Sequence, residues 1–213
     1  MKYRAPRLLP TYAAPRLRAV ALLLLMAATC QPLKSQTGGD NTYEFLNISH
    51  SAFANATGGI TVSSVRSDLS LPYFNPALLN STMDNDISLS FSTWVAGIKY
   101  GYASWAHETA VAGTFAGGVS FISYGTFTEA DEAGNITGNF TAAEYAFNII
   151  WSWQIDSSLT VGVNLKPVIS TLERYFSAGL CADIGVAWHS DRLLLDAGLV
   201  IRNAGLQIRG YTD

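Results

Sequence analysis

Residues 176–188 read FSAGLCADIGVAW, and this stretch decides the class of fold. Larger or apolar side chains occupy every second position from Phe176 to Trp188, and small residues, a cysteine and Asp183 fill the positions between them. A period of two residues is the pattern of a β-strand with two unlike faces. The stretch is also longer than the usual soluble strand of about five to six residues. It therefore predicts a long strand with one apolar face and one small, polar face.

The same alternation recurs on both sides of this stretch. It is strict in some segments and less regular in others, and short connections separate most of them. The predicted strands occupy residues 87–92, 98–107, 113–124, 145–155, 160–166, 176–188 and 193–202, and Leu206–Arg209 is expected to begin an eighth. Successive strands with short connections predict an all-β, antiparallel sheet.

Two architectures produce this pattern. A soluble sandwich buries the apolar face and leaves the polar face in water. A membrane barrel places the apolar face against lipid and lines its interior with the small, polar face. The polar face here holds mostly Gly, Ala, Ser and Thr, and its charged residues are expected on the side opposite the bulky one: Lys99, Lys166, Asp183, Asp196 and Arg202. Together with strand length, this favours an antiparallel transmembrane β-barrel.

Aromatic residues fit the same architecture. Trp94, Tyr124, Trp188 and Tyr211 lie near strand ends, where aromatic girdles meet the lipid–water boundary. Packing in a protein core would explain other aromatic residues, such as Trp151, equally well.

Charge divides the chain into a basic beginning and an acidic body. Six of the 13 basic residues precede residue 37, which leaves seven basic residues against 16 acidic ones after it. An acidic body excludes nucleic-acid binding through phosphate neutralisation. Positive charge followed by the short apolar run 19–28 predicts a cleaved signal peptide over residues 1–36, with lipidation of Cys30 as an open alternative. A plug-like or periplasmic segment is expected at 37–85 and a partial barrel at 86–213.

Connection lengths give the barrel a direction. Tight turns are predicted at 108–112, 156–158 and 190–192, all at one end, and the longest connection spans 126–142 at the other end. Outer-membrane barrels have short periplasmic turns and longer extracellular loops. The long loop is therefore a candidate partner-contact loop, and its candidate contact residues are Glu129, Asp131, Glu132 and Asn135. The alternative is that these polar groups only solvate the loop.

A sheet of seven or eight strands can have two arrangements, one open and one closed. An open half-pipe would leave the strand near Ile87 and the strand near Leu206 unpaired with each other. A closed eight-stranded barrel would pair residues 86–93 with 206–213. We expect the half-pipe.

Several motifs follow one another in a recognisable order. They are GGDNTYEFL (38–46), NPALL (75–79), IKYGY (98–102), FTEADEAGN (127–135) and VGVNLKP (161–167). This ordered set resembles the PorQ family of outer-membrane proteins, which belongs to the type IX secretion system of the Bacteroidetes. That family is similar to PorV and, more distantly, to FadL-type fatty-acid transporters.

The resemblance implies a FadL/PorV-like barrel of about fourteen strands, of which this chain holds the N-terminal seven to eight, so we expect it to be truncated at the C-terminus. It implies an outer-membrane location and a non-enzymatic role in an attachment complex with PorU, PorV and PorZ-type proteins and lipopolysaccharide. It also implies that the turn at Asn75 and Pro76 lies near the lumen, where it could gate the barrel or contact a partner.

Competing functions remain. A FadL-like channel for hydrophobic small molecules would need an apolar lumen, and a secreted soluble β-domain would not enter the membrane at all. The chain has no Gly-x-Ser-x-Gly elbow and no phosphate-binding loop, and its histidines lack the spacing of a metal site. We therefore expect no catalytic residue, cofactor or metal.

Overall fold

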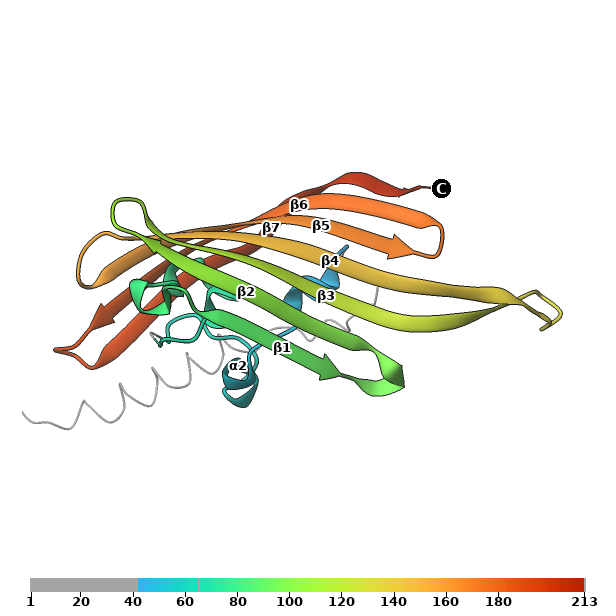
Figure 1. Cartoon of the computed structure of the whole chain (residues 1–213), viewed down its shortest axis with the longest axis horizontal. Coiled ribbons are helices and arrows are strands. Elements are labelled where there is room, and N and C mark those ends of the chain that lie inside the picture. Colours follow the sequence, from blue (N-terminus) through green and yellow to red (C-terminus); the bar gives the residue numbers. More distant parts are fainter. Residues whose placement is uncertain (1–41, 65, 213) are drawn as a thin grey trace, which may run out of the picture. The chain divides into compact units, whose positions relative to one another are not determined.

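The computed structural model describes residues 42–64 and 66–212. The predicted signal peptide, Cys30 and the start of the first motif lie outside these residues. The described part contains one sheet of seven antiparallel strands in the order of the sequence (Figure 1). The strands are β1 (Ile87–Thr93), β2 (Lys99–Thr109), β3 (Gly113–Ala130), β4 (Ile136–Gln154), β5 (Leu159–Leu172), β6 (Tyr175–Ser190) and β7 (Leu195–Thr212). The predicted all-β, antiparallel class is confirmed.

The sheet is open. Among the described residues β1 pairs with β2 alone and β7 pairs with β6 alone. The closed eight-stranded alternative is therefore wrong, and the prediction of two unpaired edges is confirmed. The prediction of an eighth strand is also wrong, because Leu206–Arg209 continue β7. Asn203, with φ of 53°, lies where the β6–β7 register shifts, which explains why the alternation seemed to stop there.

Short helices precede the sheet and lie against one of its faces. We call residues 42–64 and 66–86 the plug segment, and the sheet face that contacts it the inner face. The segment contains η2 (Glu44–Asn47), α2 (Ala52–Ala56), η3 (Leu71–Tyr73), η4 (Pro76–Leu78) and η5 (Ser81–Met83), and η6 (Val95–Gly97) follows between β1 and β2. No helix among the described residues is long and apolar enough to cross a membrane.

The core lies between the plug segment and the inner face. Phe45 and Leu46 pack with Ile122, Val168 and other residues of the strands. A second cluster joins apolar side chains of the plug segment to strands β2, β3 and β4: Leu69, Leu79, Met83, Ala106, Ala116 and Ile150. The inner face is thus a buried interface between two parts of the same chain.

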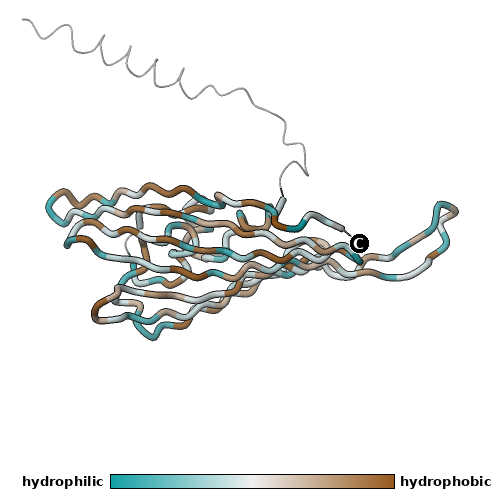
Figure 2. The backbone as a smooth tube through the Cα atoms, turned by 90° about the horizontal axis from the view of Figure 1, so that it is seen from above, coloured by the Kyte–Doolittle hydropathy of each residue, from teal (hydrophilic) through white to brown (hydrophobic). Residues whose placement is uncertain are grey.

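The two faces of the sheet differ as the alternation predicts. Ile149 and Leu199 on the outer face are 56% and 72% exposed, whereas Asn148 on the inner face is 1% exposed. Hydrophobic and hydrophilic positions alternate along the strands in Figure 2. The remaining residues assigned to the outer face, Phe147, Trp151, Leu180 and Ile184, are also exposed.

One charged residue was assigned to the wrong face. In β2 the bulky Tyr100 and Tyr102 face inward, where their rings contact His50, and Lys99 on the opposite face therefore points outward and is exposed. Lys99 is the first residue of its strand. A long cationic side chain at that position can extend to the polar boundary instead of staying on an apolar surface.

The expected long loop is mostly strand. β3 and β4 continue beyond their neighbours as a two-stranded ladder that reaches the pair Ala130–Ile136, so the connecting turn is only 131–135. Figure 1 shows this ladder projecting past the rest of the sheet. We call residues 126–140 the hairpin extension. The loop prediction for 126–142 was wrong because the register shift at Gly125 (φ 84°) interrupts an alternation that otherwise continues.

Candidate functional site

A charged pair lies on the inner face, midway along β5 and β6. Lys166 of β5 and Asp183 of β6 form an ion pair, and both side chains are 0% exposed. Asn203 joins them, because its Oδ1 accepts a hydrogen bond from Lys166 Nζ at 2.9 Å and its backbone N–H donates to Asp183 Oδ1 at 2.7 Å. The predicted inward orientation of both charges is confirmed.

Neighbouring polar groups extend this pair into a network. Asn164 Nδ2 donates to Asn148 Oδ1 at 3.2 Å and to Asp183 Oδ2 at 3.4 Å. Lys166 Nζ also lies 5.2 Å from the ring centre of Tyr73 in the plug segment. The network therefore connects four strands, β4 to β7, to the plug segment through a cation–π contact.

Arg202 makes a second connection between sheet and plug segment. Its Nη2 donates to the Leu46 carbonyl at 3.3 Å, and its guanidinium lies 5.5 Å from the ring centre of Phe74. Asp196, also predicted to face inward, pairs with His189 at 2.5 Å on the same face near a strand end, where both remain partly exposed.

The turn at Asn75 and Pro76 lies against β5 and β6. Asn75 is fully buried and caps η4, with Oδ1 accepting from the Ala77 N–H at 3.0 Å. Its Nδ2 donates to the carbonyls of Val62 at 2.7 Å and Val186 at 3.3 Å. The turn is thus held against the inner face of the sheet by hydrogen bonds to both the plug segment and β6.

His50 occupies an aromatic cluster of the plug segment and β2. Its side chain is enclosed by the rings of Tyr73, Tyr100 and Tyr102 at centre distances of 5.0, 5.8 and 5.6 Å. Burial lowers the pKa of His50 from 6.5 to about 4, because an apolar enclosure disfavours the charged imidazolium. His50 is therefore neutral at neutral pH.

The free energy of unfolding is expected to fall as pH is lowered from 6.5 to 4. In this window the unfolded chain binds a proton at His50 and the folded chain does not. The loss reaches about 3 kcal/mol at pH 4, since one pKa unit corresponds to about 1.4 kcal/mol. Urea unfolding at several pH values would measure it. A His50→Phe variant should lack this contribution, and an identical pH dependence in both chains would contradict it.

The four candidate contact residues fall in two groups. Asp131 accepts hydrogen bonds from the N–H groups of Ala133 at 3.0 Å and Asn135 at 2.7 Å, and from Asn135 Nδ2 at 2.9 Å. These bonds with Asn135 lower the pKa of Asp131. Asp131 and Asn135 therefore hold the turn, whereas Glu129 and Glu132 project as exposed carboxylates.

A pocket at the base of the hairpin extension escaped the sequence analysis. This rim pocket has a volume of about 280 Å³ and is lined by Tyr124, Phe127, Glu144, Ser170, Leu172 and Tyr211, among others. Tyr124 and Tyr211, expected in an outward girdle, face inward: Tyr124 bonds to Glu144 at 2.6 Å and Tyr211 to Ser170 at 2.8 Å. The girdle assignment failed for these tyrosines because each phenol hydroxyl has a hydrogen-bond partner on the inner face, Glu144 for Tyr124 and Ser170 for Tyr211.

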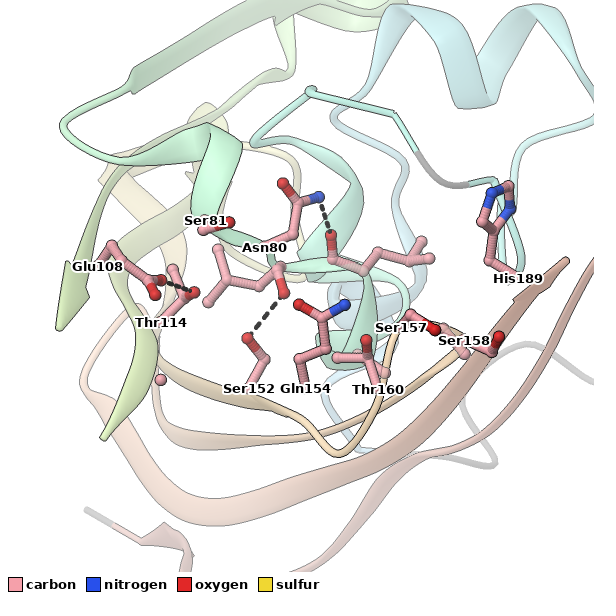
Figure 3. A pocket seen from close by; sticks show the side chains of 15 residues that line it. Asn80, Ser81, Glu108, Thr114, Ser152, Gln154, Ser157, Ser158, Thr160 and His189 are labelled. Carbon is pink, nitrogen blue, oxygen red and sulfur yellow. Dashed lines mark hydrogen bonds between the residues drawn. The ribbon is translucent and has the colours of Figure 1, made fainter. Parts of the chain in front are cut away.

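A second cavity, of about 210 Å³, lies at the opposite end, beside the tight turns (Figure 3). Ser152 Oγ donates to the Leu79 carbonyl at 2.7 Å there, and Thr114 bonds to Glu108. The Ser152 bond attaches the end of η4 to β4, and the Thr114 bond joins β3 to β2. Among the described residues, no group of three or more His, Cys, Asp or Glu side chains could hold a metal ion.

Comparison with known proteins does not assign the chain to a family. No protein-family model matches it, and no curated protein matches it. The geometry above and the ordered motifs of the sequence are therefore the features that bear on its function.

Proposed function

We propose that this chain is part of a PorQ-like outer-membrane β-barrel and serves type IX secretion without catalysing a reaction. Its role is to hold a partner of the attachment complex, of the PorU, PorV or PorZ type, at the cell surface. The observation that carries the proposal is a sheet with an apolar outer face and an inner face covered by the plug segment. One acidic hairpin projects from the end of this sheet.

The distribution of charge supports a lipid-facing exterior. Lys166, Asp183 and Arg202 all face inward, whereas residues such as Ile184, 59% exposed, cover the outside. Lys or Arg on a lipid face costs about 2–4 kcal/mol near the midplane. A soluble protein rarely exposes so continuous an apolar surface.

The packed interior argues against a FadL-like channel for hydrophobic molecules. Beneath the plug segment the inner face carries buried polar groups that bond to one another, including Asn148, Asn164 and the Lys166–Asp183 pair. A hydrophobic passage would need an apolar lining there. The channel is therefore the weaker of the two candidate functions, and the experiment below distinguishes it from partner binding.

The open edges impose a condition on the membrane state. No unpaired strand edge is tolerated in lipid, so β1 and β7 must pair with further strands there. With seven antiparallel strands, β1 and β7 run in the same direction. An odd number of added strands keeps every pair antiparallel, and seven would give the fourteen-stranded barrel that the resemblance implies.

Removing the hairpin extension tests the proposal. Residues 128–139 are replaced by Asn-Gly, because Phe127 and Phe140 are register partners that a two-residue turn can join. In a complete barrel that contains this chain, produced in a bacterium that secretes through this system, we expect normal insertion but at least about tenfold lower recovery of PorZ-type partners, since loops on rigid scaffolds carry recognition. Co-purification from outer membranes measures it.

A double substitution, Glu129→Gln with Glu132→Gln, serves as the matched control because it keeps the hairpin and the Asp131 bonds of its turn and removes the charges of the two projecting carboxylates. An intermediate loss would assign part of the binding to charge. Undiminished partner recovery and normal cargo attachment in the hairpin deletion would contradict the proposal. Lost fatty-acid uptake with intact secretion would instead support the channel.

A further inference from the structure

The rim pocket contains a buried carboxylate without a cationic partner. Glu144 is 8% exposed, and its Oε2 accepts a hydrogen bond from the Tyr124 hydroxyl at 2.6 Å. Within residues 42–64 and 66–212 it forms no ion pair, in contrast to the buried Asp183 on the same face. A buried charge is costly unless an opposite charge or several hydrogen bonds compensate it. The site therefore has an unmet preference for a cation.

Aromatic rings surround the same carboxylate. Tyr124, Phe127 and Tyr211 line the pocket with Glu144. Two of the rings are fixed by hydrogen bonds to Glu144 and Ser170, and Phe127 stacks on Phe140 at 5.1 Å between ring centres. Several aromatic rings beside one carboxylate are the chemistry that recognises ammonium and guanidinium groups.

The shape and surroundings of the pocket favour a long side chain that ends in a cation. The pocket has a volume of about 280 Å³, and its lining includes the apolar side chain of Leu172, against which a methylene stem can pack. The exposed Glu129 and Glu132 of the adjacent hairpin extension add negative charge outside it. Charge of one sign around an opening raises the local concentration of the opposite sign.

The geometry points to a binding site for a lysine or arginine side chain of a protein partner, with Glu144 as its counter-ion and the three rings as its walls. The pocket's preference for a cation stands on these contacts alone. Its assignment to a partner in secretion rests on the proposed function and would make the hairpin extension and the rim pocket one docking surface.

Binding of a short peptide tests the site directly. The purified full chain in dodecyl maltoside micelles is titrated calorimetrically with N-acetyl-Gly-Lys-Gly-amide at physiological salt. The same peptide with norleucine in place of lysine keeps the stem and removes the charge, and an arginine peptide and tetramethylammonium complete the set. We expect binding of the lysine and arginine peptides and at least about tenfold weaker binding of the norleucine peptide.

Variants separate the pocket from general charge. Glu144→Gln, which keeps the size and the Tyr124 bond, should weaken lysine-peptide binding by at least about tenfold, equivalent to about 1.4 kcal/mol. Tyr211→Leu should weaken it about two- to fivefold through loss of one cation–π wall. Glu173→Gln removes one charge beside Leu172 but outside the pocket, and should change binding less than twofold.

Three results would overturn the assignment. They are equal binding by Glu144→Gln and the unsubstituted chain, equal losses in Glu144→Gln and Glu173→Gln, or binding of the norleucine peptide as tightly as the lysine peptide. Binding of tetramethylammonium without either peptide would overturn the protein partner as the source of the cation. Peptide binding in a chain that has no role in secretion would refute the proposed function and leave the cation site intact.

Discussion

Replacing Lys166 by methionine is expected to lower the free energy of unfolding by about 3–5 kcal/mol. The substitution leaves the Asp183 carboxylate fully buried without its cation. It also removes the donor to Asn203 and the contact with the Tyr73 ring. Urea unfolding in detergent micelles, followed by tryptophan fluorescence, measures the change.

The complementary variant and the double variant show whether the two charges act as a pair. Asp183→Asn should also destabilise strongly, because it leaves the Lys166 ammonium buried and unpaired. Lys166→Met with Asp183→Asn should cost clearly less than the sum of the single losses, since neither uncompensated charge remains. Strictly additive losses would contradict a direct ion pair.

Replacing Gly162 by alanine is expected to destabilise the chain by about 1–3 kcal/mol through overpacking. A Cβ atom at this position would lie 2.4 Å from the Pro76 carbonyl carbon and 2.5 Å from the Ala77 nitrogen. Both are backbone atoms of η4, so no side-chain rotation relieves the contact. The plug segment must shift away from β5, and limited trypsin digestion at Arg66 should become faster.

Gly117→Ala in β3 is the matched control. A Cβ atom there meets nothing within 4 Å, and alanine is favoured over glycine in a strand by about 0.5–1 kcal/mol. The control variant should therefore be as stable as the unsubstituted chain or slightly more stable. Equal behaviour of the Gly162→Ala and Gly117→Ala variants would refute the packing of η4 on β5.

The strands and their faces could be predicted because side-chain direction in a strand repeats every two residues. From Phe147 to Trp151 and from Leu180 to Ile184, one local pattern determines both strand and face. The rule fails where the backbone departs from it. A register shift at Gly125 concealed the hairpin extension, and Asn203 made one strand resemble two.

The candidate sites depend on register and packing between distant segments, which local pattern does not contain. Glu144 and Tyr211 meet in the rim pocket only because β4, β5, β6 and β7 lie in order with their observed registers. The sequence marks Asn75 and Gly185 as turn and small residue, but not their contact. The Lys166–Asp183 pair is an intermediate case, since the alternation predicts that both residues face inward but does not predict that they pair.

The central claim is that the outer face of the sheet contacts lipid. Trp105, Trp151 and Trp153 all lie exposed on that face. Their fluorescence is compared for the full chain in micelles of dodecyl maltoside and of its brominated form, in which bromine quenches only rings in contact with detergent tails. A lipid-facing outer face predicts strong quenching by the brominated detergent and weak quenching by aqueous acrylamide. Unchanged emission in the brominated micelles, with strong acrylamide quenching, would contradict it.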